Sequence, residues 1–260
     1  MPAMIIAGIH YDVAGEGDPV LLIHGLALDG RTWDDQVDVF AATHRVIRFD
    51  LPGSGRSAIP SGTWSLAETA NGVLHDAGVT RAHVVGLSLG GRAATDLALA
   101  HPAIVRSLVL VDAVVAGYKF SDEWRGRMKG VVELAASHGT RRANEQWLAD
   151  PTFAPAMRQP SVARRLREMV LSYSGAHWTN PRWIAAVAPP TIERLGEIGA
   201  PTLVIVGELD VPDFQTMADT LAHGIPGARK VVVPNAGHLA NIEAPEIVNR
   251  LILDFWATVP

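Results

Sequence analysis

The chain has 260 residues, of which 48% are hydrophobic and 19% are charged, and its formal net charge at pH 7 is −5. The apolar content excludes disorder of the whole chain, and the acidic balance argues against nucleic-acid binding, which needs a basic surface. Because there is no Cys, disulfide scaffolds, thiol catalysis and cysteine zinc sites are excluded, and a reducing, cytoplasmic location is expected.

From the N-terminus, residues 1–6 lack the basic stretch and long apolar segment of a secretory signal. No apolar run reaches the roughly 18 residues of a membrane span, so no membrane association is expected. Short β-rich runs then alternate with helical stretches. Strands are predicted at Ile5–Val13, Val20–His24, Arg45–Asp50, His83–Leu87 and Ser107–Asp112, and helices at Leu66–Ala77 and Leu89–Ala100.

Residues 113–195 interrupt this alternation. They carry 12 basic and 7 acidic side chains, a net of +5, whereas the remainder carries 10 and 20, a net of −10. Helices are predicted there at Ser121–Ser137, Arg141–Leu148 and Ser161–Tyr173. Alternation resumes with strands at Thr202–Val206 and Arg229–Val233 and helices at Phe214–His223 and Pro245–Ala257. We therefore predict an α/β core domain formed by residues 1–112 and 196–260, with a mostly parallel sheet covered on both faces, and a helical cap at 113–195.

The first chemical signal is Gly86-Leu87-Ser88-Leu89-Gly90, which joins a predicted strand directly to a predicted helix. This is the Gly-x-Ser-x-Gly pattern in its expected context. The two glycines allow neighbouring segments to approach, so that Ser88 can occupy a strained turn at the carboxyl end of the sheet. Ser88 is the candidate nucleophile.

A serine hydroxyl needs a general base, and the base needs an orienting carboxylate. His238 follows the predicted strand 229–233 in a loop that contains Gly237, and it is the candidate base. Asp210, in a loop after the strand 202–206, is the favoured acid because its order in the chain, Ser…Asp…His, suits this turn type. Asp112 remains a second candidate, with stabilisation of the start of the insertion as its expected role.

Two backbone amides are expected to bind a developing oxyanion. One is the N–H of Leu89, at the start of the helix after Ser88, and the other is that of Leu26, in the loop after the strand 20–24. His24 is expected to brace that loop through a side-chain hydrogen bond. No metal site is indicated, since there is no His-Glu-x-x-His and no dense His/Asp cluster, and the chemistry requires no cofactor.

Taken together, these motifs resemble the α/β-hydrolase family. The matching segments are His24-Gly25, 49–57, the turn at Ser88, 207–210 and 236–238. The resemblance implies an eight-stranded, mostly parallel sheet with a helical cap between the sixth and seventh strands. Ser88 argues against haloalkane dehalogenases, which use Asp as nucleophile. The run 28–33 and the overall size are similar to enol-lactonases and small esterases.

The predicted cap is rich in aromatic and basic side chains. Its aromatic residues are expected to pack the cap on the core, with some of them lining a cleft over Ser88: Trp124, Trp147, Trp178, Trp183, Tyr118, Phe120, Phe153 and Tyr173. His138 and His177 could touch a substrate. A sharper hypothesis is that one of Arg141, Arg142, Arg164, Arg165 and Arg167 meets a substrate carboxylate.

These observations favour a serine hydrolase that cleaves carboxylic esters or lactones through an acyl-enzyme. Its partner is a small-molecule substrate, and the oligomeric state is not indicated. One alternative is a carbon–carbon bond hydrolase with the same fold and triad. Another is a non-catalytic small-molecule receptor, against which the intact Ser, Asp and His candidates argue.

Overall fold

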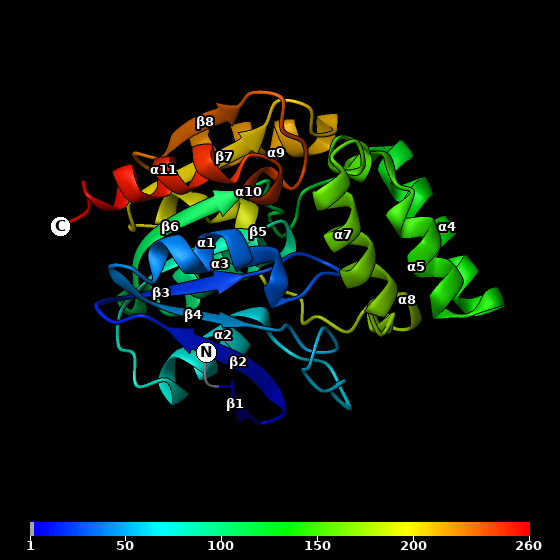
Figure 1. Cartoon of the computed structure of the whole chain (residues 1–260), viewed down its shortest axis with the longest axis horizontal. Helices are drawn as coiled ribbons and strands as arrows, with labels where there is room; N and C mark the ends of the chain where they lie inside the picture. Colours follow the sequence, from blue (N-terminus) through cyan, green and yellow to red (C-terminus); the bar gives the residue numbers. More distant parts are fainter. Residues whose placement is uncertain (1–2) are drawn as a thin grey trace.

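The computed structural model describes residues 3–260. Met1 and Pro2, part of the stretch in which no secretory signal was expected, lie outside the described residues. Eight strands form one sheet in the order β1-β2-β4-β3-β5-β6-β7-β8 (Figure 1). Their bounds are β1 Ala3–Ile6, β2 Ile9–Ala14, β3 Asp18–Ile23, β4 His44–Phe49, β5 Ala82–Leu87, β6 Val105–Val111, β7 Thr202–Gly207 and β8 Arg229–Val233. All pairs from β4 to β8 are parallel, which confirms the mostly parallel eight-stranded sheet.

The prediction of a single strand at Ile5–Val13 is wrong. The chain turns back at Ala7 and Gly8, and β1 pairs antiparallel with β2, with Ile6 opposite Ile9. Ala7 and Gly8 both have positive φ, +48° and +80°, as a two-residue turn between antiparallel strands requires. Ala is an uncommon residue at such a position, so the apolar run concealed the turn.

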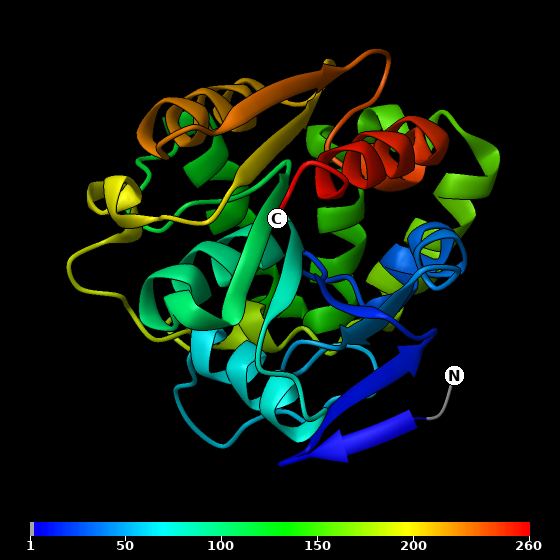
Figure 2. The ribbon, with the colours of Figure 1, turned by 90° about the vertical axis from the view of Figure 1, so that its left-hand side faces the viewer.

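Helices cover both faces of the sheet, as the strand–helix alternation predicted. Figure 2 shows α1 and α11 on one side of the sheet and α2, α3 and α9 on the other. Their bounds are α1 Asp34–Phe40, α2 Leu66–Asp76, α3 Leu89–Ala100, α9 Pro212–Gly224 and α11 Pro245–Trp256. The central strands β5 and β7 are buried throughout, because parallel strands with both faces covered need apolar side chains on both sides.

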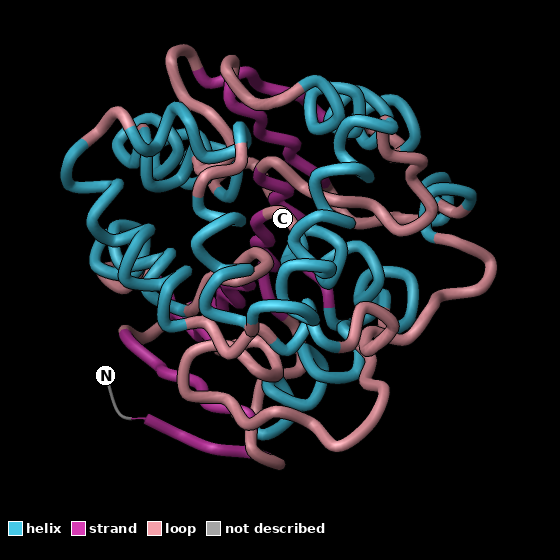
Figure 3. Tube along the Cα trace, turned by 90° about the vertical axis from the view of Figure 1, so that its right-hand side faces the viewer, coloured by secondary structure: helices cyan, strands magenta, loops and turns pink. Residues whose placement is uncertain are grey.

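The long connection between β6 and β7 is helical. It contains α4 Asp122–His138, α5 Thr140–Leu148, α6 Ala154–Met157, α7 Pro160–Ser172 and α8 Ala176–Thr179. Figures 1 and 3 show these helices gathered at the end of the sheet toward which the parallel strands point. In α/β proteins, ligands bind at that end. The helical insertion therefore lies over the region in which the chemical motifs were expected.

The remaining elements are short. α10 spans Ala240–Glu243, and 3-10 turns occupy Gly30–Trp33, Pro102–Ile104, Pro151–Phe153, Thr191–Glu193 and Leu195–Glu197. Helix α1 and these short elements were not predicted from the sequence. Among residues 3–260, no helix combines the length and apolar character that crossing a membrane requires.

Candidate active site

Ser88 occupies a strained turn between β5 and α3. Its φ of 54° and ψ of −115° lie in a region that residues other than glycine rarely adopt. A Cβ added at Gly90 would lie 2.0 Å from the Ile23 carbonyl oxygen, and one at Gly86 would lie 2.2 Å from the Gly90 oxygen. Because neither glycine has a Cβ, the backbones of β3, β5 and α3 approach one another closely beside Ser88, as the Gly-x-Ser-x-Gly pattern predicted.

Two backbone N–H groups lie beside this turn. Leu89 is the first residue of α3, and Leu26 belongs to the loop after β3. Across residues 3–260, neither N–H donates a hydrogen bond to another protein group. A Cβ added at Gly25 would lie 3.2 Å from the Ser88 Cβ, which shows how closely this loop approaches the serine. Both amides, together with the positive end of the α3 dipole, are available to an anionic oxygen.

The loop that carries Leu26 is braced by His24, which is fully buried. The Leu51 N–H donates to His24 Nε2 at 2.8 Å, so Nδ1 carries the proton and donates to the Gly25 carbonyl oxygen at 2.7 Å. Burial lowers the pKa of His24, and this keeps the ring in the neutral form that both bonds need. The bracing role predicted for His24 is confirmed.

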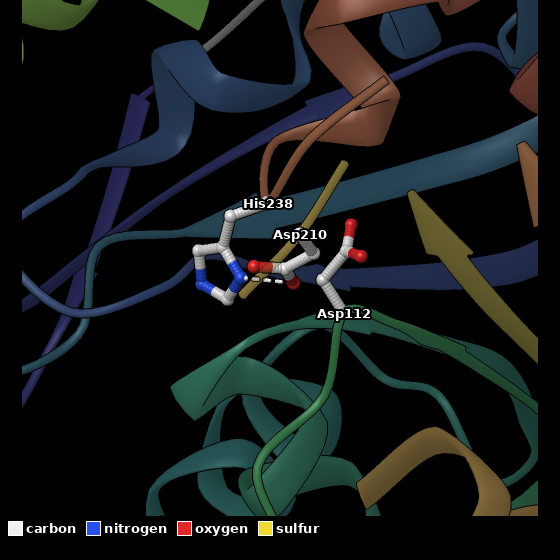
Figure 4. Close-up of side chains that lie close together, drawn as sticks. All are labelled: Asp112, Asp210 and His238. Carbon is white, nitrogen blue, oxygen red and sulfur yellow. Dashed lines mark hydrogen bonds and ion pairs between the residues drawn. The ribbon is translucent and has the colours of Figure 1, made fainter. Parts of the chain in front are cut away.

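His238 and Asp210 are brought together from two separate loops. His238 Nδ1 lies 2.8 Å from Asp210 Oδ2, and both side chains are buried. Asp210 Oδ1 accepts the N–H of Val211 at 2.7 Å, which fixes the carboxylate. In Figure 4 the second ring nitrogen of His238 points away from the carboxylates. The arrangement holds Nδ1 protonated and leaves Nε2 as the basic nitrogen.

The loop around His238 rests on two further carboxylates. Glu243 accepts the N–H groups of Gly237 at 2.8 Å and of Leu239 at 3.0 Å, on either side of the histidine. Asp112 accepts the N–H groups of Gly207 at 2.8 Å and Ala240 at 3.3 Å. The expectation that Asp112 stabilises the start of the insertion is therefore wrong, since it ties the end of β7 to the segment after His238 (Figure 4).

Asp112 and Glu243 are held in an environment that disfavours their charge. Burial raises the pKa of Asp112 well above its usual range, and the neighbouring Asp210 raises it further. Burial also raises the pKa of Glu243. Asp112, Asp210 and His238 present polar atoms within 4.8 Å of one another, close enough to consider a metal. Nδ1 of His238 and the oxygens of both aspartates are already engaged in hydrogen bonds, so the cluster suits proton chemistry better.

A cavity of about 690 Å³ lies between the core and the helical insertion. Ser88 and His238 both line it, together with Leu26 and Leu89. Within residues 3–260 no direct hydrogen bond joins Ser88 to His238. The cavity is large enough for a small organic molecule, and such a molecule would touch the serine, the imidazole and the oxyanion loop at once.

The insertion supplies much of the cavity wall. Its aromatic lining consists of Phe120, Trp124, Trp147, Phe153 and Trp178, which confirms that part of the aromatic set faces the cleft. These rings join Phe214 of α9, which lies 5.3 Å from Trp124 and 4.0 Å from the His238 imidazole between ring centroids. The apolar packing against His238 keeps water from one side of the ring.

The predicted arginine contact is not borne out. Among residues 3–260, none of the five arginines named in that hypothesis lines the cavity. Arg165, for example, donates to Asp35 of α1 at 2.6 Å. The basic residues that do line the cavity are Arg92 of α3 and Lys129 of α4, and each has an acidic partner, Asp96 and Glu133 respectively. The predicted contact with His138 also fails, since this residue lies on the exposed end of α4.

Sequence reasoning missed Phe214, Glu243 and Arg92. Glu243 carried the clearest signal, since it follows His238 by five residues at the end of a short helix. Arg92 lies one turn after Ser88 and was foreseeable from the helical repeat. No sequence pattern connected Phe214 to His238, because their proximity depends on how α9 packs against β7.

Known proteins are similar to this chain over almost its whole length. The sequence profile described as "alpha/beta hydrolase fold" matches residues 18–245. The chain is 32% identical to RutD of Azorhizobium caulinodans, named as a carbamate hydrolase, over 97% of this chain and 96% of that protein. It is also 32% identical to the pimeloyl-[acyl-carrier protein] methyl ester esterase of Yersinia enterocolitica, over 95% and 96%. The crystal structure of the enol-lactonase from Burkholderia xenovorans LB400 superposes with a TM-score of 0.83 and 26% identity, over 98% of this chain and 100% of that one.

Proposed function

The chain belongs to the α/β-hydrolase family and is a hydrolytic enzyme, and from that premise we propose that it cleaves carboxylic esters or lactones with Ser88, His238 and Asp210 as a catalytic triad. The observation that carries the proposal is the cavity lined by both Ser88 and His238, with Asp210 hydrogen bonded to the far side of the imidazole. The arrangement suits nucleophilic catalysis, in which each of the three groups has one task.

In the proposed mechanism, Ser88 Oγ attacks the carbonyl carbon while His238 Nε2 takes the hydroxyl proton. Asp210 holds the Nδ1–H tautomer and stabilises the imidazolium that forms. The imidazolium then gives its proton to the leaving alkoxide, and an acyl-enzyme remains on Ser88. A water molecule, deprotonated by His238, attacks the acyl carbon. As the bond between the acyl carbon and Ser88 Oγ breaks, the imidazolium returns the proton to Oγ and the carboxylic acid is released. In a lactone the leaving alkoxide stays attached to the acyl group.

The tetrahedral intermediates carry negative charge on the former carbonyl oxygen. We assign the stabilisation of this oxygen to the N–H groups of Leu26 and Leu89, which have no acceptor in the described part of the protein. One such donor is typically worth about 10²–10³ in rate. The strain at Ser88 fits this role, because it presents the hydroxyl and the adjacent amide to the same side.

Residues 113–195 act in this proposal as a cap that shapes the substrate space. Pro155 of α6 supports that role. A Cβ added at Gly237, next to His238, would lie 2.6 Å from the Pro155 ring, so the insertion approaches the loop that carries the histidine. Esters and lactones are favoured as substrates because the methyl ester esterase and enol-lactonase named above are similar over almost the whole chain. The absence of Cys supports a cytoplasmic location, and the chemistry needs no cofactor.

The test is hydrolysis of p-nitrophenyl butyrate by the purified protein and its Ser88→Ala variant. We expect kcat to fall by about 10⁵-fold or more in the variant, as for other members of a catalytic triad. Ser137→Ala, on the exposed end of α4, is the matched control and retains full activity. Unchanged hydrolysis by Ser88→Ala would refute the assignment. A γ-lactone and an N-alkyl carbamate in the same assay identify the preferred carbonyl group.

A further inference from the structure

His177 is a half-buried histidine of α8 that the proposed mechanism does not use. It lines the same cavity as Ser88. Its Nδ1 lies 2.6 Å from the Tyr173 hydroxyl, and the same hydroxyl accepts the backbone N–H of His177 at 3.1 Å. These two bonds to the Tyr173 hydroxyl fix the orientation of the imidazole ring. They engage Nδ1 and leave Nε2 without a bond to Tyr173.

The hydrogen-bond pattern assigns the tautomer of His177. The Tyr173 oxygen already accepts the backbone N–H, and within residues 3–260 its own proton has no acceptor other than His177 Nδ1. Tyr173 therefore donates to Nδ1, and the imidazole proton resides on Nε2. Burial lowers the pKa of His177 to about 4, so the ring is neutral near pH 7 and Nε2 is a donor.

This Nε2–H group is buried and has no hydrogen-bond partner among residues 3–260. Two neighbouring polar side chains of the insertion are paired. The neighbouring Trp178 donates its indole N–H to Asn144 at 2.7 Å, and Asn144 in turn donates to the Tyr173 carbonyl oxygen at 2.7 Å. The indole N–H of Trp147, which also lines the cavity, is likewise buried without a partner among residues 3–260. An unpaired buried donor is costly, and a ligand in the adjoining cavity can supply the missing acceptor.

The charges that line the cavity indicate what kind of acceptor fits. Arg92 is bound by Asp96 at 3.3 Å and by the Ala185 carbonyl oxygen at 3.1 Å, and Lys129 lies 3.5 Å from Glu133. The remaining titratable lining residues are His177, which is neutral, and His238, which is engaged by Asp210. Since no lining cation is left uncompensated, a buried substrate carboxylate would lack a counter-charge.

We propose that His177 is a specificity-determining residue whose Nε2–H donates a hydrogen bond to an uncharged oxygen of the substrate, other than the scissile carbonyl oxygen. The substrate class is then a neutral ester or lactone that carries a second oxygen acceptor, such as a ketone, on an otherwise apolar body. This inference rests on the proposed function for the identity of the scissile bond. The aromatic wall formed by the insertion accommodates the apolar body.

The test is ligand binding to the Ser88→Ala protein, in which esters persist. The ligands are methyl octanoate and its four analogues with a ketone at carbon 4, 5, 6 or 7, and the readout is the fluorescence of Trp124, Trp147 and Trp178, which line the cavity. We expect at least one keto ester to bind about tenfold more tightly than methyl octanoate, the effect of one satisfied buried donor. Equal affinities across the whole series would overturn the inference without any variant at His177.

Two variants then assign the preference to His177. In Ser88→Ala/His177→Leu the affinity ratio should fall to about 1, whereas Ser88→Ala/His177→Gln, which keeps a side-chain N–H donor, should retain part of it. Ser88→Ala/His138→Leu is the matched control, because His138 lies on the exposed end of α4, and it keeps the full ratio. A ratio that survives in the folded Leu variant contradicts the proposal. Turnover of the same esters by the protein with Ser88 intact tests the proposed function separately.

Discussion

The core and the helical insertion contribute to the cavity in different ways. The core supplies Ser88, His238, Asp210 and the two backbone amides, all from short loops at the ends of β3, β5, β7 and β8. The insertion supplies aromatic rings and, among residues 3–260, two unpaired donors, those of His177 and Trp147, all from helices or the turns beside them. In the proposed mechanism, the chemistry therefore resides in loops held by a rigid sheet, whereas substrate choice depends on how the helices of the insertion pack.

The turns beside the candidate site and helix α4 of the insertion also differ in how much change their backbones tolerate. In the core, added Cβ atoms at Gly86, Gly90 and Gly207 would meet backbone atoms at 2.0–2.2 Å. In the insertion, Gly126 and Gly130 of α4 have no atom within 4 Å of an added Cβ. A fixed geometry is needed where proton transfer occurs, and the surface of the insertion carries no such constraint.

The largest expected effect concerns Asp210 and Asp112, the two aspartates that lie beside His238. Asp210→Asn should lower kcat by about 10⁴-fold, because the amide favours the wrong imidazole tautomer. Asp112→Asn should lower kcat by less than about tenfold, because Asp112 bonds backbone N–H groups and its raised pKa already favours an uncharged side chain. Steady-state hydrolysis of p-nitrophenyl butyrate measures both variants. A larger loss in Asp112→Asn than in Asp210→Asn would reverse the assignment of the acid.

The same glycine-to-alanine change should have opposite effects in the two regions. Gly90→Ala forces the new methyl group against the Ile23 carbonyl oxygen, and we expect a loss of about 3 kcal/mol or more in the free energy of unfolding. Gly126→Ala, on the exposed side of α4, should raise this free energy by about 0.5–1 kcal/mol, because Ala favours the helix. Urea unfolding measures both values, and a stabilising Gly90→Ala would show that the backbone approach below Ser88 is not rigid.

The neutral ring of the half-buried His177 makes the insertion sensitive to acid. Its folded-state pKa of about 4 lies below the value of about 6.5 expected in the unfolded chain. The unfolded state therefore binds more protons as the pH falls, and stability that is present above pH 6.5 is lost toward pH 4. Between pH 7 and pH 4 the unmodified protein should lose about 3 kcal/mol more than His177→Gln. An equal loss in the two proteins would show that His177 is not buried in its neutral form.

Much of the core and its chemical residues could be predicted from sequence, because the signals are local. The five residues around Ser88 encode a turn whose glycines are required by contacts with adjacent segments. Helix α3 and strand β8 begin and end at the predicted residues, since a tight turn or a proline marks their ends. The pairing of His238 with Asp210 was predicted from the chain order Ser…Asp…His that this turn type uses. The two loops meet because parallel strands deliver their loops to one edge of the sheet.

What could not be predicted depends on contacts between distant segments. The backbone N–H partners of Asp112 come from β7 and α10, and nothing beside Asp112 in the sequence names them. Phe214 reaches His238 only through the packing of α9. The arginine-rich helices suggested an anion site, but in the described structure those arginines lie outside the cavity lining, and the basic residues that line it, Arg92 of α3 and Lys129 of α4, are paired with acids. Charge counts carry no information about which face of a helix turns inward.

The central claim is that Ser88 is an activated nucleophile. The most direct measurement is mass spectrometry of the protein after reaction with a fluorophosphonate, which phosphonylates activated serines. We predict one adduct, located on Ser88 in the peptide map, and its loss when His238 is replaced by Ala. An intact protein without adduct, or an adduct on another serine with Ser88 unmodified, would contradict the account.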